Sequence, residues 1–276
     1  MHELLIPVNA KVERAEKHIS DFNTAASLFV EAGSYSVTGE RDPKTRQPFY
    51  YVSEASPVPP RIMVIVGDAI QNLRSALDYL ASALVSANRQ TPTTVTGFPI
   101  LKDPKKEEPR FLSKVKGMRQ EAIDEIIRQK PYRGGDATLW CLHDFSNADK
   151  HRFLLAAGAA IHSFNIGQHA KESIPRTMPP EAHQDFKRDL ERTISLVDAM
   201  PDVWTELPNK IGFPLKKGDK LYVDFPDFQI NDNIQFRFFI AFNEQGPAYG
   251  QAVTSVLGGF RRRVLDTIAA LSPFLG

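Results

Sequence analysis

Two stretches of the sequence place charged and amide side chains inside otherwise apolar helical segments. The first is GDAIQNLRSALDYLA at 67–81, which carries Arg74 and Asp78. The second is LHDFSNADKHRFLL at 142–155. Its polar candidates are His143, Asn147, Asp149, Lys150 and His151. Burial of such groups is costly unless they find partners, so we expect the two clusters to face each other and to form a site.

Arg74 and Asp78 are four residues apart, a spacing that lets two side chains touch on a helix. One interpretation is a pair of site residues beside the apolar stripe of the helix. The alternative is an intrahelical ion pair on a solvated face, which contributes little to stability.

In the second cluster, Ser146 and Asp149 follow Leu142 on the inner line of the helix. Asp149 then points to the core and needs a cation, for which we nominate Arg74. The alternative is a capping box, in which the helix breaks near Phe145 and Ser146-x-x-Asp149 starts a new one. A cap accepts N–H bonds within its own segment, whereas a site residue reaches another helix.

Hydrophobic periodicity predicts the elements that must position these clusters. We expect helices at 9–31, 61–88, 137–164, 181–200 and 248–272, and one or two short ones between 109 and 130. Asp136 is the expected N-cap of the helix that follows it. We expect a β-hairpin insertion near 34–54, strands near 221–242 (221–226 and 234–242), and a mobile loop at 166–180.

The predicted fold is mainly α (α+β): a bundle of four to five long helices beside one small antiparallel sheet. The hairpin and the later strands are expected to join in that sheet, and residues 1–276 are expected to fold as a single domain.

Composition limits the classes of function. A net charge of +1 gives no global attraction to nucleic acid or anionic membrane. No apolar run is long enough to span a bilayer, and the N-terminal residues lack a secretory-signal pattern, so we expect a cytoplasmic protein with no membrane partner. The single cysteine, Cys141, excludes an internal disulfide framework and a Cys-based structural zinc site. Phosphate-loop, dinucleotide-binding and nucleophile-elbow motifs are absent.

Local basic clusters remain open to two interpretations, a solvated face or contacts to phosphate. They lie at Lys105/Lys106, Lys114/Lys116/Arg119, Lys216/Lys217/Lys220 and Arg261–Arg263.

At NLRSALDYLA and LHDFSNADKHR the chain resembles a family of uncharacterised bacterial proteins with the same two signatures. It is more distantly similar to HEPN (higher eukaryotes and prokaryotes nucleotide-binding) helical domains. Many of these are metal-independent ribonucleases of toxin and defence systems, with an arginine followed after four to six residues by a histidine, so a role in stress or phage defence is implied. Arg74 matches that arginine, whereas positions 79–81 are Tyr, Leu and Ala.

The resemblance implies a homodimer that binds or cleaves RNA or a nucleotide, without a cofactor or bound metal. Arg74 would hold phosphate, Asp149 would orient Arg74 or Lys150, and His143 or His151 would transfer a proton.

Two alternatives stay open. The first is a non-enzymatic interaction module, in which the polar groups of both clusters form a buried network that fixes the register of the helices. The second is a metal-dependent hydrolase that uses His18, His143 and His151, since three histidines on facing helices of a bundle can bind a divalent metal.

Overall fold

A computed structural model of the chain describes residues 3–151, 155, 157–174, 184–207, 212–226, 228–243 and 246–276, and the side chains of 150, 151 and 186 lie outside that description. The chain divides into two compact units. The helical unit comprises 1–26, 59–157 and 242–276, and the sheet unit comprises 27–58 and 158–241.

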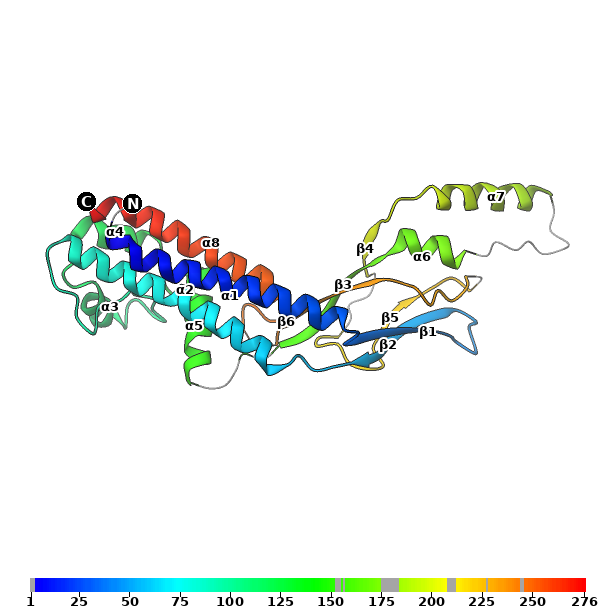
Figure 1. Ribbon diagram of the computed structural model, residues 1–276, viewed down its shortest axis with the longest axis horizontal. Helices are drawn as coiled ribbons and strands as arrows, with labels where there is room; N and C mark the ends of the chain where they lie inside the picture. Colours follow the sequence, from blue (N-terminus) through cyan, green and yellow to red (C-terminus); the bar gives the residue numbers. More distant parts are fainter. Residues whose placement is uncertain are drawn as a thin grey trace. The chain divides into compact units, whose positions relative to one another are not determined.

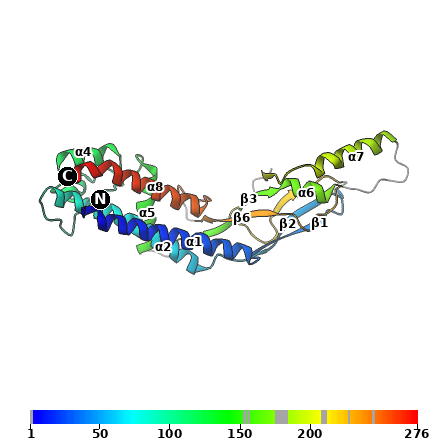
Figure 2. The same cartoon turned by 45° about the horizontal axis from the view of Figure 1, so that its top comes forward.

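The helical unit is organised around helix α2 (Pro60–Ala87), which packs against α5 (Ala137–His151) and α8 (Val253–Leu271). Apolar residues at steps of three and four give α2 a stripe that is fully buried, including Ile70, Leu73 and Leu77. Most of α1 (Ile6–Glu31) also belongs to this unit, and Figures 1 and 2 both show it beside α2.

Shorter elements complete the helical unit. They are η1 (Glu3–Leu5), α3 (Glu108–Val115), α4 (Gln120–Arg128) and η2 (Ser272–Leu275). Asp136 begins α5 as predicted, because its Oδ1 accepts the backbone N–H of Leu139 at 2.7 Å.

Within the described residues, the sheet unit holds two small three-stranded antiparallel sheets. In the first, β2 (Pro48–Ala55) pairs with both β1 (Tyr35–Arg41) and β5 (Lys220–Val223). In the second, β3 (Ala157–Asn165) lies between β4 (Trp204–Glu206) and β6 (Phe236–Phe242). Helices α6 (Ile166–Ser173) and α7 (Gln184–Asp198) lie between β3 and β4 in the sequence.

Both sheets contribute to one hydrophobic core. Val52 and Leu221 of the first sheet meet Ala159 of the second there. Phe236 and Phe238 of β6 are partly buried and pack against this core. The alternation along the strands explains the arrangement, since every second residue of a strand faces the same side.

The α+β class and the placement of most elements are confirmed. The predicted single sheet is wrong in part: β5 joins the hairpin, but β6 pairs in the second sheet. The prediction of a single domain over 1–276 stays a prediction.

The predicted helix at 137–164 is wrong over 157–164. The described helix α5 spans Ala137–His151, residues 152–154 and 156 lie outside the described part of the chain, and 157–165 form strand β3. A short, uniformly apolar run does not distinguish a buried strand from a buried helix by periodicity. Gly158 of β3 lies close to Pro214: a β-carbon at that position would overlap the proline ring, so the close approach requires glycine.

The predicted mobile loop at 166–180 is also wrong in its first half. Residues 166–173 form α6, capped by Asn165, whose side chain accepts the N–H of Gln168 at 3.0 Å. Residues 175–180 lie outside the described part of the chain.

No helix in the described part of the chain is long and apolar enough to cross a membrane.

The packing of α2 can be tested with two valines two residues apart. Val66 is fully buried and Val64 is 46% exposed. We expect Val66→Ala to lower the free energy of unfolding by about 1–3 kcal/mol, because it removes buried methyl groups and leaves a cavity. Val64→Ala should change it by less than about 0.5 kcal/mol, since alanine favours a helix at an exposed position. Urea denaturation followed by circular dichroism measures both, and equal effects would show that this face of α2 is not a packed interface.

Candidate functional site

The two polar clusters lie on α2 and α5, which pack against each other. Gln71 of α2 joins them at one point: its Nε2 donates to the backbone oxygen of Ser146 at 2.8 Å and to Asp149 Oδ2 at 3.2 Å. The Ser146 hydroxyl donates back to Gln71 Oε1 at 3.0 Å. The expectation that the two clusters face each other is therefore met by the described side chains.

The Arg74 guanidinium is the centre of a second group of contacts, and the residue is only 6% exposed. Nη1 donates to Asp78 Oδ1 at 2.8 Å, and Nη2 donates to the backbone oxygen of Phe98 at 2.9 Å. Nε lies 3.5 Å from His143 Nδ1 on α5. Three of its donors therefore face protein acceptors from three different segments.

Asp78 connects α2 to the loop that precedes α3. Its Oδ1 accepts the N–H of Phe98 at 2.9 Å as well as the Arg74 bond. A β-carbon on Gly97 would lie 2.8 Å from the same oxygen, so a residue with a side chain at 97 would crowd the carboxylate. The Asp78 side chain is 45% exposed, so the ion pair contacts solvent through its carboxylate. The alternative of an intrahelical ion pair names the correct two residues, Arg74 and Asp78. It is wrong about the solvated face, because the arginine is buried.

His143 lies between two hydrogen-bond donors. Its Nδ1 faces Arg74 Nε, and its Nε2 lies 3.0 Å from Asn147 Nδ2. A neutral imidazole can accept one of these bonds, whereas the protonated ring could accept neither. Burial first, and then the charges of Arg74, Arg110 and Lys114, lower the pKa of His143 from 6.5 to about 4, while Asp78 opposes the shift. His143 is therefore neutral at pH 7.

Lys114 of α3 brings a further cation to this group, which we call the Arg74 cluster (Arg74, Asp78, Lys114, His143 and Asn147). Burial lowers the pKa of Lys114, and the Asp78 charge opposes that shift. The sequence places Lys114 in a basic cluster, but it gives no sign that α3 brings the ammonium toward α2.

The predicted Arg74–Asp149 pair is wrong. The partner of Asp149 is Gln71, and its carboxylate lies against Gly67, where a β-carbon would come within 2.5 Å of Oδ1. The capping-box alternative is also wrong, because α5 runs from Ala137 to His151 without a break and Ser146 binds α2. A helical wheel shows which face Asp149 occupies but not which residue of the next helix lies opposite.

The remaining site candidates are Asn147, Lys150 and His151, and the structure describes only the first of these side chains. Asn147 is exposed and contacts His143. The side chains of Lys150 and His151 lie outside the described residues. A catalytic role for any residue of the two clusters stays a prediction.

The metal-site hypothesis also stays a prediction, because it includes His151, whose side chain lies outside the described residues. Among the side chains that are described, no group of three or more His, Cys, Asp and Glu could hold a metal ion.

A separate polar group lies in the sheet unit, and no local pattern in the sequence points to it. His169 Nε2 lies 2.7 Å from Asp224 Oδ2, and the Ser173 hydroxyl lies 3.1 Å from His169 Nδ1. All three residues are at most 3% exposed, and Tyr50 and Tyr222 pack edge-on against the imidazole. Ser173 also donates to the backbone oxygen of His169, so the group is a sealed structural network despite its Ser, His and Asp composition.

Comparison of the chain with protein-family models, with curated proteins and with solved structures found no match. The suspected family signatures and the distant HEPN resemblance therefore stay predictions, and the geometry alone carries the functional argument.

The low pKa of His143 makes a prediction about stability and pH. Between pH 6.5 and 4 the unfolded chain binds a proton at this position and the folded chain does not. The free energy of unfolding should therefore decrease as the pH falls from 6.5 to 4, and His143→Gln should reduce that slope. Urea titrations at several pH values measure the slope, and NMR titration of the His143 ring checks the cause. A ring that titrates near 6.5 would contradict the assignment.

The Arg74–Asp78 pair predicts a measurable coupling. Asp78→Ala leaves a buried guanidinium without its carboxylate and Phe98 N–H without its acceptor, so we expect a loss of about 2 kcal/mol. Combining it with Arg74→Met should cost less than the sum of the two single changes.

The matched control is the pair Arg188–Asp185 of α7, whose side chains are 80% and 92% exposed. Its coupling energy should be close to zero. Equal coupling energies in the two pairs would contradict a structural role for the buried arginine.

Proposed function

We propose that the chain binds RNA or a nucleotide through phosphate at the Arg74 cluster, as a HEPN-like protein. The proposal includes the finer fold prediction, a helical unit that forms a bundle of four to five long helices and pairs as a homodimer. The role in stress or phage defence that the resemblance implies stays a prediction.

The observation that carries the proposal is the grouping of cations around Asp78 and His143. Arg74 Nε lies 3.5 Å from His143 Nδ1, and a β-carbon on Gly97 would lie 2.8 Å from Asp78 Oδ1 and 3.1 Å from Lys114 Nζ, so the ammonium approaches the same carboxylate. Arg74, Arg110 and Lys114 are close enough to lower the pKa of His143, and Asp78 is the carboxylate that opposes them there. Arg110 is itself paired with Glu107 at 2.7 Å, on the exposed side of α3. A phosphate group would neutralise cations that the protein holds together, beside an imidazole whose two nitrogens already face Arg74 and Asn147.

The same geometry supports binding more strongly than cleavage. A neutral imidazole could take a proton from a ribose hydroxyl, but a base with a pKa of about 4 is weak at neutral pH. Arg74 is also already engaged by Asp78 and Phe98. Lys114 and Arg110 are thus the first contacts for phosphate, with Arg74 behind them.

The test is binding of a short single-stranded RNA, followed by fluorescence anisotropy over a range of salt concentrations. Lys114→Gln should weaken binding by about tenfold and reduce the dependence on salt by about one phosphate contact. Arg110→Gln should act in the same direction.

Arg128→Gln is the matched control, because Arg128 forms the same i, i+3 ion pair with Glu125 on α4. It should leave the affinity unchanged. Equal losses in all three variants would indicate a diffuse charge effect, and no saturable binding by the unmodified protein would remove the proposal. RNA integrity in the same samples, with and without EDTA and beside Arg74→Ala, reports metal-independent cleavage.

A second candidate function is a non-enzymatic interaction module. It is favoured because the polar groups already have hydrogen-bond partners within the protein. Gln71, Ser146 and Asp149 interlock α2 with α5, and Arg74 has acceptors from its own helix, a loop and α5. In that case Arg74→Ala lowers the melting temperature, and neither RNA binding nor cleavage is detected in any variant.

A further inference from the structure

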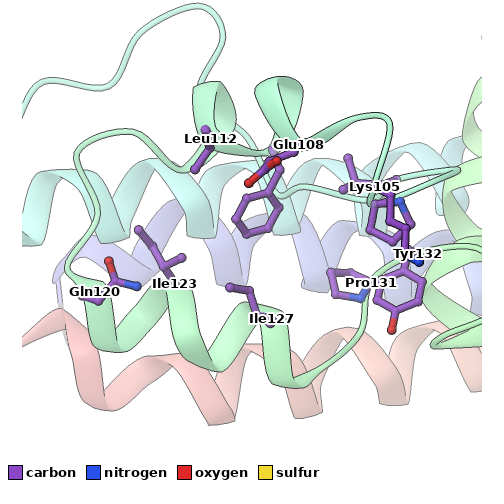
Figure 3. A pocket seen from close by; sticks show the side chains of 11 residues that line it. Lys105, Glu108, Leu112, Gln120, Ile123, Ile127, Pro131 and Tyr132 are labelled. Carbon is purple, nitrogen blue, oxygen red and sulfur yellow. The ribbon is translucent and has the colours of Figure 1, made fainter.

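A cavity lies in the helical unit between α3 and α4, and its lining residues are different from those of the Arg74 cluster. It encloses about 500 Å³, within the range of small-molecule pockets. Figure 3 shows Glu108 and Leu112 of α3 on one side and Ile123 and Ile127 of α4 on the other. Tyr132 closes one end and Gln120 lies toward the other.

The lining is mainly apolar. Its principal side chains are those of Leu101, Phe111, Leu112, Ile123, Ile127 and Tyr132. Leu112 and Ile127 are 57% and 52% exposed, so large apolar surfaces of both helices stand in water at the mouth. A ligand with an apolar body would remove this surface from water, which is favourable in proportion to the area buried.

The base of the cavity is held by backbone hydrogen bonds. Leu101 N–H donates to the oxygen of Pro131 at 3.0 Å, and Arg133 N–H donates to the oxygen of Leu101 at 3.0 Å. Leu101 and Tyr132 form a parallel bridge between two otherwise separate segments. These bonds hold the Leu101 and Tyr132 part of the lining in place, which lowers the entropic cost of ordering it when a ligand binds.

Two opposite charges accompany the apolar lining. Lys105 and Glu108 are three residues apart and both line the cavity. The neighbouring charged residues have partners of their own, Lys106 with Asp103 and Arg110 with Glu107. Lys105 and Glu108 are both exposed, and within the described residues no ion pair joins them, so a ligand with two opposite charges can reach both side chains.

We propose that this pocket binds a small molecule with an apolar body and a zwitterionic head, the chemical class of the apolar α-amino acids. The body occupies the space between Phe111 and Ile127, the ligand carboxylate faces Lys105, and the ligand ammonium faces Glu108. This inference is independent of the proposed RNA site, because the two sites share no residue.

Three probes with the same aromatic body separate the contributions: L-phenylalanine, phenethylamine and 3-phenylpropionate. Ligand-observed NMR titration of the full chain gives an affinity for each. L-phenylalanine should bind most tightly. Glu108→Gln should weaken L-phenylalanine and phenethylamine by about threefold and leave 3-phenylpropionate unchanged, because an exposed charge pair contributes modestly. Lys105→Gln should weaken L-phenylalanine and 3-phenylpropionate.

Lys106→Gln is the control, since Lys106 neighbours the pocket in sequence but does not line it. Ile127→Glu places a charge in the apolar wall at a half-exposed position and should abolish binding of all three probes without unfolding the protein, which circular dichroism verifies. No saturable binding, binding that survives Ile127→Glu, or equal affinities for the three probes would each overturn the proposal. None of these outcomes would test the proposed RNA binding at the Arg74 cluster, which has its own experiment.

Discussion

The buried charge of Arg74 is the constraint on which the geometry of the helical unit depends. A guanidinium that is almost removed from water must keep its donors paired, and the residues that pair with it come from α2, the loop at 97–98 and α5. These bonds fix how α5 and the loop lie on α2. Apolar packing alone would tolerate small shifts of one helix along another, whereas this hydrogen-bonded arrangement tolerates few. The polar group therefore specifies the helix contacts that the apolar stripe of α2 stabilises.

Each unit holds a histidine in a polar group, half-buried at His143 and buried at His169, and the charges around the two rings differ. His143 is surrounded mainly by cations and lies at a partly open edge, so a negative ligand complements its surroundings. His169 faces the carboxylate of Asp224, and both side chains are at most 2% exposed. The first arrangement leaves positive charge that a ligand can neutralise, and the second already contains its own counter-charge. This difference is why the candidate site lies in the helical unit.

The sequence predicts features that depend on local pattern. The stripe on α2, the hairpin and the Asp136 cap follow from periodicity and from capping chemistry within a few residues. Prediction from the sequence fails where the outcome depends on a distant partner. The apolar run at 157–165 forms a strand because β4 and β6 pair with it. Asp149 contacts Gln71 because of how far α5 is shifted along α2. Lys114 shows what could not be predicted about the site. A lysine in a basic cluster gives no indication in the sequence of which helix its ammonium will approach.

The helical unit is built from three separate segments of the chain, and α8 is in the last of them. The side chains of Asn23 and Thr254 hydrogen-bond although 231 positions separate them. At ordinary translation rates α2 leaves the ribosome on the order of ten seconds before α8. During that interval the apolar stripe of α2 lacks the helix that covers it in the folded chain, and loop closure over such distances slows folding. A newly made chain is therefore most exposed to aggregation, and most in need of a chaperone, in the interval before α8 has been synthesised.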